Sequence, residues 1–262
     1  MVTGVVAVGD SITVGATRDV GTLPCRSYAA WVAETLGEPV TIHARGGASS
    51  GEVVNSLLPE VAGRYHLALT CVGVNDVIRS GRFNPDALAA NLAVILTDLR
   101  QHAERVAVLT ISETTGSVPT LWAYGPTRRR RIAEANRVIC RVSAEHGVEV
   151  VTVPALHGRH VLWADRIHPT ARGQVEIAEA VVQQLGLPGS PHALAADRIR
   201  PPGLRWDMEY AWWLTKNIVR VPPRRAVGTM LRAVGRSGQT DGEHDQRPQG
   251  KAVQQPVGDA AH

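Results

Sequence analysis

The sequence predicts an α/β fold of three αβα layers. It is a flavodoxin-like, five-stranded parallel sheet of order 2-1-3-4-5, with a helical appendage at the C-terminus. The main observation is a rhythm over residues 1–187, where short apolar, β-branched runs alternate with longer segments of helical periodicity. Strands joined by helices form right-handed crossovers, which favours the doubly wound order. No internal repeat interrupts the pattern.

The expected strands are apolar runs bounded by turn residues, at 4–9, 39–44, 66–72, 105–111 and 148–153. Helical periodicity predicts helices at 26–37, 51–62, 85–103, 127–146 and 170–185. Local residues explain several helix ends. Asn84 and Pro85 begin a helix with a capping side chain and a proline at its first position, and Gly147 and Gly186 suit left-handed helix ends.

Composition limits the class of protein. Apolar residues make up 44% and charged residues 20% of the chain, which is typical of a soluble globular protein. No apolar run approaches the ~20 residues of a membrane span, and no basic region precedes the first apolar run, so we expect a cytoplasmic protein. Three cysteines without metal-ligand spacing predict reduced thiols, and we expect neither a metal nor a cofactor.

Charge and composition divide the chain into three parts. Residues 1–190 form the predicted α/β domain, with 17 basic and 17 acidic residues. Residues 191–236, with 9 basic against 3 acidic residues, form a predicted basic, Trp-rich, amphipathic helical appendage. Residues 237–262 are dominated by Gly, Gln, Asp and Pro, and this composition predicts a disordered tail.

The appendage has an apolar stripe at helical spacing, formed by Trp206, Tyr210, Trp213, Leu214 and Ile218. This stripe could pack on the core as an extra helix. Alternatively, residues 205–234 could contact an anionic membrane surface as a peripheral basic amphipathic segment. No nucleic-acid-binding motif accompanies the positive charge, so we expect no nucleic-acid partner. Oligomeric state is not specified by the sequence.

Candidate catalytic residues follow the predicted strands, whose carboxyl ends meet at one edge of a parallel sheet. Ser11, in Gly9-Asp10-Ser11, is the candidate nucleophile. His168 can accept its proton, and Asp165, three residues earlier, can orient the imidazole and stabilise the imidazolium. We interpret Asp10 as a turn former beneath the nucleophile.

An oxyanion also needs hydrogen-bond donors. The candidates are the backbone N–H groups of Ser11 and Gly47 and the side-chain amide of Asn75. Gly46 competes with Gly47 for the second position, and we prefer Gly47 because small residues leading into a helix follow it. Asp76 is interpreted as a cap of the helix after Asn75.

The four blocks resemble those of the SGNH (GDSL-type) hydrolases, which carry G-D-S, a glycine-containing turn, G-x-N-D and D-x-x-H-P in this order. Three blocks match without alteration, and the resemblance covers residues 4–186. The second block departs, because Ile42 stands where the family often has asparagine. The resemblance implies a metal-independent esterase or lipase with Ser11, His168 and Asp165 as its triad and Gly47 and Asn75 as oxyanion donors.

The expected substrate is a small-molecule, lipid or carbohydrate ester with an acetyl or a short- to medium-chain acyl group. No segment reads as the long lid of a true lipase. The loops 112–126 and 155–164 are apolar enough to line a substrate pocket, for which the candidate contacts are Trp122, Leu162 and Trp163. Two other functions fit the same residues, an acyltransferase and a non-catalytic binding module.

Overall fold

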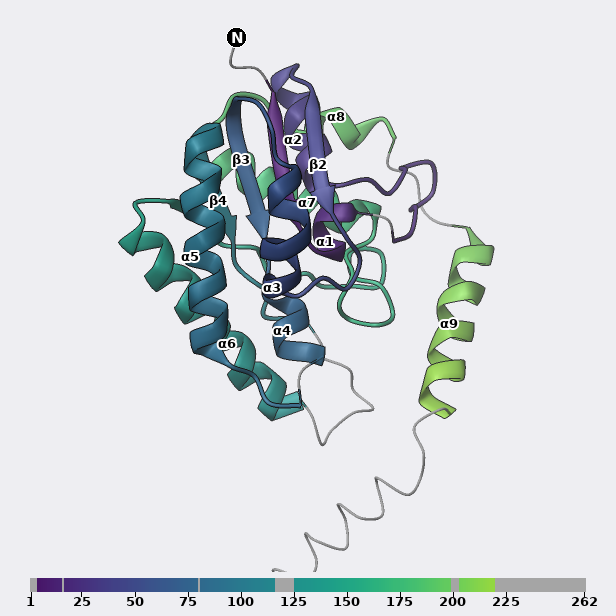
Figure 1. Ribbon diagram of the computed structural model, residues 1–262. Coiled ribbons are helices and arrows are strands. Elements are labelled where there is room, and N and C mark those ends of the chain that lie inside the picture. Colours follow the sequence, from purple (N-terminus) through teal and green to yellow (C-terminus); the bar gives the residue numbers. More distant parts are fainter. Residues whose placement is uncertain (1–3, 16, 80, 116–124, 199–202, 220–262) are drawn as a thin grey trace, which may run out of the picture. The chain divides into compact units, whose positions relative to one another are not determined.

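The centre of the fold is an all-parallel sheet with the order β2-β1-β3-β4-β5 (Figure 1). The computed structural model describes residues 4–15, 17–79, 81–115, 125–198 and 203–219. Fold class and strand order are as predicted. The strands are β1 (Val5–Gly9), β2 (Val40–Ala44), β3 (Tyr65–Cys71), β4 (Ala103–Leu109) and β5 (Glu149–Val151).

Strand β1 occupies an interior position, and all five of its residues are buried. A strand buried on both faces reads as a continuous apolar run, as it does here. Its last residue, Gly9, is in register with Ala44 of β2 and Cys71 of β3. The three strands therefore end side by side, and the loops that follow them begin at one edge of the sheet.

Helices cover both faces of the sheet (Figure 1). On one face α2 (Tyr28–Leu36) packs against α7 (Ala171–Gln184), and α8 (Pro191–Ala196) contacts both. On the other face α5 (Pro85–His102) packs against α6 (Gly125–Glu145). Each of these helices buries an apolar face, which is the main source of its stability in a globular protein.

The segment expected as one helix at 51–62 is irregular. It consists of α3 (Ser50–Glu52), a π-helical turn (Val53–Leu57) and a 3-10 turn (Leu58–Glu60). Pro59 explains the change, because it has no N–H and its ring clashes with the carbonyl four residues earlier in a regular α-helix. Two short helices follow strands directly: α1 (Ser11–Val14) follows β1 and α4 (Val74–Arg79) follows β3.

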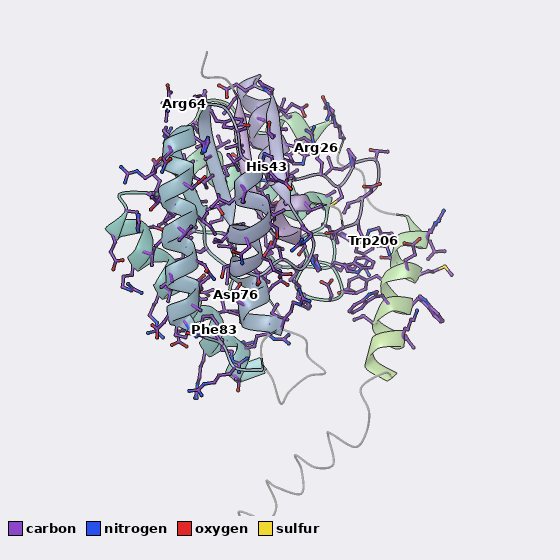
Figure 2. The ribbon with its side chains drawn as sticks, in the orientation of Figure 1. Arg26, His43, Arg64, Asp76, Phe83 and Trp206 are labelled. Carbon is purple, nitrogen blue, oxygen red and sulfur yellow. The ribbon has the colours of Figure 1, made fainter. Side chains whose placement is uncertain are left out.

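Helix α9 (Leu204–Val219) contacts the core through its aromatic residues. The indole N–H of Trp206, labelled in Figure 2, donates a hydrogen bond to the carbonyl of Asp19 at 3.1 Å. The rings of Trp206 and Tyr210 both lie 5.5 Å from that of Trp163. Ion pairs add to the contact, between Arg18 and Glu209 (3.6 Å) and between Arg159 and Asp207 (3.3 Å).

Another side of α9 is exposed. Leu204, Met208 and Trp212, spaced four residues apart, are 76%, 64% and 68% exposed. The predicted tail at 237–262 and the appendage beyond residue 219 lie outside the described residues. In the described part of the chain, none of the helices combines the length and apolarity needed to cross a membrane.

Candidate active site

Ser11 begins the short helix that follows strand β1. Asp10 is the N-cap of this helix, and its Oδ1 accepts a hydrogen bond from the backbone N–H of Ile12 at 2.9 Å. Gly9 is required for this close turn, because a Cβ there would lie 2.4 Å from Thr13 Oγ1 and 2.5 Å from the carbonyl oxygen of Cys71. Tight packing against a neighbouring strand therefore explains the glycine of the Gly-Asp-Ser block.

A continuous chain of hydrogen bonds joins Ser11, His168 and Asp165. Ser11 Oγ lies 2.8 Å from His168 Nε2, and His168 Nδ1 lies 2.7 Å from Asp165 Oδ2. The other carboxylate oxygen of Asp165 accepts from the backbone N–H groups of Ile167 at 2.9 Å and His168 at 3.0 Å. In the neutral imidazole, an Nδ1–H directed at the carboxylate leaves Nε2 as the acceptor that faces the Ser11 hydroxyl.

The loop that carries Asp165 and His168 is a tight turn closed by backbone contacts. Trp163 N–H donates to the carbonyl of His168, and Arg166 N–H donates to the carbonyl of Trp163, both at 2.9 Å. Arg166 has a φ of 59°, the only positive value outside glycine among the described residues. Such a conformation is unfavourable for arginine and persists only where the surrounding contacts impose it.

The two side chains alter each other's pKa. The hydrogen bond to Asp165 raises the pKa of His168 above its ordinary value, and it outweighs burial, which acts in the opposite direction. Burial opposes ionisation of Asp165, but the hydrogen bonds and charge of His168 and the N–H of Ile167 outweigh it, so its pKa is lowered. The pair therefore favours an ionised carboxylate beside an imidazole that readily holds a proton.

Asp10 is a second carboxyl group at the site, and it is fully buried. Burial raises its pKa from 3.8 to about 7, although the N–H of Ile12 and the charge of His168 act in the opposite direction. The prediction that Asp10 forms the turn beneath the nucleophile agrees with its position as the cap. The Gly-Asp-Ser turn pattern in the sequence does not show that Asp10 is buried or that its pKa is raised.

The two other predicted oxyanion donors follow β2 and β3, the two strands that flank β1. Asn75, in the first turn of α4, donates from Nδ2 to the carbonyl of Ala48 at 3.0 Å, and the same atom lies 3.5 Å from Asp10 Oδ2. Gly47 has a φ of 80°, where glycine is favoured, and its carbonyl accepts a hydrogen bond from Arg79 Nη1. Gly46 has no positive φ, so the turn requires glycine at Gly47.

Asp76, labelled in Figure 2 and expected as a cap of the helix after Asn75, contacts a second segment of the chain. It lies within α4, and its carboxylate accepts from the backbone N–H of Ser50 at 2.9 Å and from the Ser50 hydroxyl at 2.6 Å. Asn91 Nδ2 donates to the same hydroxyl at 2.9 Å. The carboxylate thus ties α4 to the beginning of α3. This contact joins residues far apart in the chain, and nothing in the local sequence indicates it.

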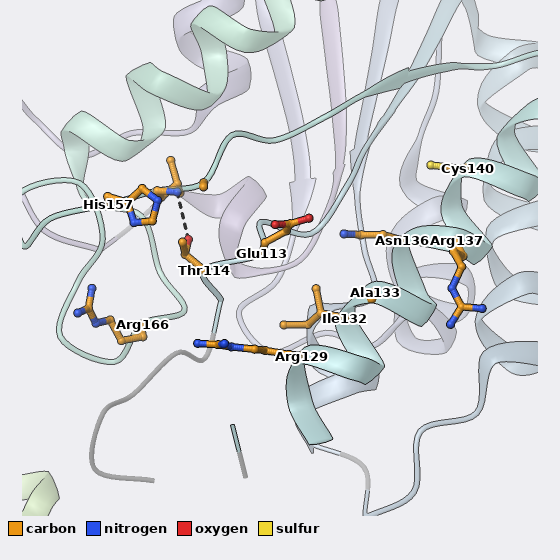
Figure 3. A pocket seen from close by; sticks show the side chains of 12 residues that line it. Glu113, Thr114, Arg129, Ile132, Ala133, Asn136, Arg137, Cys140, His157 and Arg166 are labelled. Atoms are coloured by element: carbon orange, nitrogen blue, oxygen red, sulfur yellow. Dashed lines mark hydrogen bonds between the residues drawn. The ribbon is translucent and has the colours of Figure 1, made fainter. Parts of the chain in front are cut away.

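A small, mostly apolar pocket is lined by chain neighbours of several predicted site residues. Its volume is about 20 Å³, and its lining includes Ile12, Val74 and Ile167, each of which adjoins a predicted site residue in the chain. A polar pocket of about 420 Å³ is lined by Asn75, Asp76, Arg79 and their neighbours. A third pocket, of about 830 Å³, is shown in Figure 3.

Two of the three predicted substrate contacts, Leu162 and Trp163, are buried. Leu162 and Trp163 are 1% and 4% exposed, and neither lines any of these three pockets. Trp163 is covered by the rings of Trp206 and Tyr210, because the apolar side of α9 packs on it. Trp122 lies outside the described residues.

The described residues contain no group of three or more His, Cys, Asp or Glu side chains placed to hold a metal ion. The cysteines Cys25, Cys71 and Cys140 are free thiols. Cys25 donates its S–H to the carbonyl of Gly15 at 2.8 Å, and Cys71 is buried beneath the site.

The family model for the GDSL-like lipase/acylhydrolase family matches residues 7–175, a segment that contains every predicted site residue. The chain belongs to this family and is a carboxylic ester hydrolase. The resemblance seen in the sequence motifs is thereby confirmed. No curated protein shows a significant sequence match to the chain.

Several solved structures share the fold. An acetylxylan esterase from Geobacillus stearothermophilus is 18% identical with a TM-score of 0.55, and the match covers 71% of this chain and 95% of that one. An alpha/beta hydrolase from the metagenome of Lake Arreo, Spain, is 20% identical with a TM-score of 0.55, covering 70% and 95%. A lipolytic protein of the G-D-S-L family from Veillonella parvula is 16% identical with a TM-score of 0.53, covering 69% and 96%. At these identities the likeness concerns the fold.

Proposed function

We propose that the protein is a serine esterase that hydrolyses acetyl and other short-chain acyl esters through an acyl-enzyme intermediate. The observation that carries this proposal is the hydrogen-bond chain from Ser11 Oγ through His168 to Asp165, with separations of 2.8 and 2.7 Å. A serine hydroxyl is a weak nucleophile at neutral pH, and an adjacent imidazole held by a carboxylate activates it.

In the acylation step, Ser11 Oγ attacks the ester carbonyl while His168 Nε2 takes the hydroxyl proton. The resulting imidazolium gives this proton to the leaving alkoxide, and Asp165 stabilises the imidazolium without accepting its proton. Water then repeats the sequence on the acyl-enzyme, with His168 again acting first as base and then as acid. The carboxylate is prepared for this task, because its pKa is lowered and both its oxygens are hydrogen-bonded.

The negative oxygen that forms in both steps needs donors already in place. We assign this role to the backbone N–H groups of Ser11 and Gly47 and to the side-chain amide of Asn75. The amide has two N–H bonds, and one is used on the carbonyl of Ala48 at 3.0 Å, which holds the group in position. The other is directed at Asp10 Oδ2 over the longer distance of 3.5 Å, and the substrate oxygen would take the place of this weaker contact.

The small pocket supports a small acyl group. A volume of about 20 Å³ holds little more than one water or methyl group. Its lining residues Ile12, Val74 and Ile167 are chain neighbours of the nucleophile, the amide donor and the base, which supports a role for this pocket in holding the acyl group. These features support an acetyl group more than a medium chain. The acetylxylan esterase among the structures of the same fold acts on an acetyl ester, as its name states.

The test compares 4-nitrophenyl esters from acetate to octanoate with wild-type protein and Ser11→Ala. We expect the highest kcat/KM with acetate and a loss of roughly 10⁴-fold or more in the variant. Ser56→Ala is the matched control, because Ser56 is an exposed serine outside the site. Fluorophosphonate should label the wild type and the control but not Ser11→Ala.

Equal rates in wild type and Ser11→Ala would contradict the serine mechanism and favour a non-catalytic binding module. Labelling of Ser11 without release of acid, but with transfer of the acetyl group to an added alcohol, would identify an acyltransferase. The two alternatives therefore give different results in the same assay.

We also propose that the exposed side of α9 contacts an anionic membrane surface. Leu204, Met208 and Trp212 are more than half exposed and share one side of the helix. The surrounding sequence at 191–236 carries 9 basic and 3 acidic residues, which suits anionic lipid headgroups. We expect full-length protein to sediment with phosphatidylserine-containing vesicles but not with phosphatidylcholine vesicles, and Trp212→Ser to weaken sedimentation. The exposed Val94→Ser on α5 serves as control, and equal binding of both variants would contradict this contact.

A further inference from the structure

The pocket of about 830 Å³ in Figure 3 has an unusual charge. It lies between α6, the segments at 113–114 and 155–157, and the loop that carries Asp165 and His168. Its described lining contains the arginines Arg129, Arg137 and Arg166 but only one carboxylate, that of Glu113. Figure 3 shows the side chain of Arg129 extending from α6 toward the side of the pocket where Arg166 lies.

No ion pair with another described residue balances this positive charge. None of the three arginines forms an ion pair with a described residue. An arginine guanidinium presents a planar fork of N–H groups that suits a carboxylate or a phosphate.

The pocket borders the proposed catalytic centre on the side of the base. Arg166 lies between Asp165 and His168 in the chain, and Leu156 lines both this pocket and the small apolar pocket that Ile12 also lines. Arg166 has an unfavourable left-handed backbone, with a φ of 59°, and it lies within the hydrogen-bonded turn that also carries Asp165 and His168. A residue kept in such a conformation next to reacting groups is a candidate for a functional task.

We propose that this pocket binds an anionic group, a carboxylate or a phosphate, on the alcohol part of the ester. The assignment to the alcohol follows from the proton transfer, because His168 must reach the leaving oxygen and the alcohol must therefore lie on the side of the His168 loop. This inference rests on the proposed esterase function and specifies its substrate class as acetyl esters of anionic alcohols.

The test uses two esters with the same acyl group, phenyl acetate and 4-acetoxybenzoate, whose alcohol carries a carboxylate. The measured quantity is the ratio of kcat/KM for the anionic ester to that for the neutral ester. We expect Arg129→Gln to lower this ratio about tenfold, since a charge-assisted hydrogen bond is lost, and Arg129→Lys to retain part of it. Arg141→Gln is the matched control, because Arg141 lies on the same helix outside the pocket and pairs with Glu145 at 2.9 Å.

A second measurement does not depend on turnover. Calorimetry of full-length wild type should show that 4-hydroxybenzoate binds more tightly than phenol, and that Arg129→Gln weakens its binding about tenfold. Equal binding of 4-hydroxybenzoate and phenol, or an unchanged ratio in Arg129→Gln, would overturn the anion site while leaving the esterase intact. The esterase proposal would be overturned instead if the wild type hydrolysed neither ester in a Ser11-dependent reaction while 4-hydroxybenzoate still bound more tightly than phenol.

Discussion

Gln174 hydrogen-bonds to the backbone of Ile12, the residue that follows Ser11. Its Nε2 donates to the carbonyl of Ile12 at 3.0 Å, and its Oε1 accepts from the N–H of Tyr28 at 2.9 Å. The fully buried amide thus joins α7 to both α1 and α2. His168 lies just before α7, so this contact helps to bring its imidazole to a serine 157 residues away.

We expect Gln174→Leu to destabilise the protein by about 1–3 kcal/mol, because it leaves the Ile12 carbonyl and the Tyr28 N–H buried without partners. Urea unfolding measures this loss, and kcat on an acetate ester should fall more than KM rises as the hydroxyl and imidazole lose their alignment. Gln183→Leu, near the end of the same helix, should have a smaller effect. Equal effects at the two positions would show that the buried hydrogen bonds of Gln174 contribute no more to stability and activity than the exposed side chain of Gln183.

Replacing Asn75 by alanine removes a proposed oxyanion donor. We expect kcat on acetate esters to fall roughly 10²–10³-fold with a small change in KM, since the oxygen carries full negative charge only in the transition state. Asn55→Ala, at an exposed position, is the control. A circular dichroism spectrum that matches the wild type separates this effect from misfolding, and a large rise in KM with unchanged kcat would argue against the assignment.

The pH dependence of kcat/KM should report His168. The imidazole must be neutral to act as a base, and its pKa is raised by the hydrogen bond to Asp165. The acid limb of the wild-type profile is therefore expected above the ordinary histidine value of about 6.5. Asp165→Asn removes the charge, so activity should drop and the limb should move to lower pH. An acid limb that stays in place in Asp165→Asn would show that another group controls it.

Asp10 should make the folded protein less stable as the pH rises. Its carboxyl holds its proton up to about pH 7 in the folded state, whereas its ordinary pKa is 3.8. Between these values the unfolded chain has released the proton and the folded chain has not, so raising the pH favours unfolding. Asp10→Asn cannot ionise, and its stability relative to wild type should be greater at pH 8 than at pH 5.

Thermal unfolding at the two pH values tests this expectation, with the exposed Asp86→Asn as control. A difference between wild type and Asp10→Asn that is the same at both pH values would show that the carboxyl does not titrate in this range. Activity is measured separately from stability, because the substitution also alters the surroundings of Asn75. In the wild type, Asn75 Nδ2 lies 3.5 Å from Asp10 Oδ2. In Asp10→Asn the NH₂ group of the new amide would face this Nδ2, so two hydrogen-bond donors would oppose each other.

Much of the fold followed from local patterns. The apolar run ending at Gly9 and the capping pair Asn84-Pro85 act within a few residues of themselves, and β1 and α5 begin and end close to the expected places. Strand order followed from the alternation of strands and helices, since the hand of the crossovers leaves few arrangements. The irregular segment at 50–60 was missed, because the apolar spacing concealed the effect of Pro59.

At the site, residue type and order indicated Ser11, Gly47, Asn75, Asp165 and His168, because each chemical task accepts few side chains. Positions in the chain do not give the distance in space between residues that follow different strands. The short distance between Ser11 and His168 is therefore decided by the packing of α7 on α2. The same limit explains why the contacts of Asp76, Gln174 and Trp163 could not be predicted from the sequence. Their partners Ser50, Ile12 and Tyr210 are brought together only when sheet, helices and α9 pack, and burial then gives Asp10 its raised pKa.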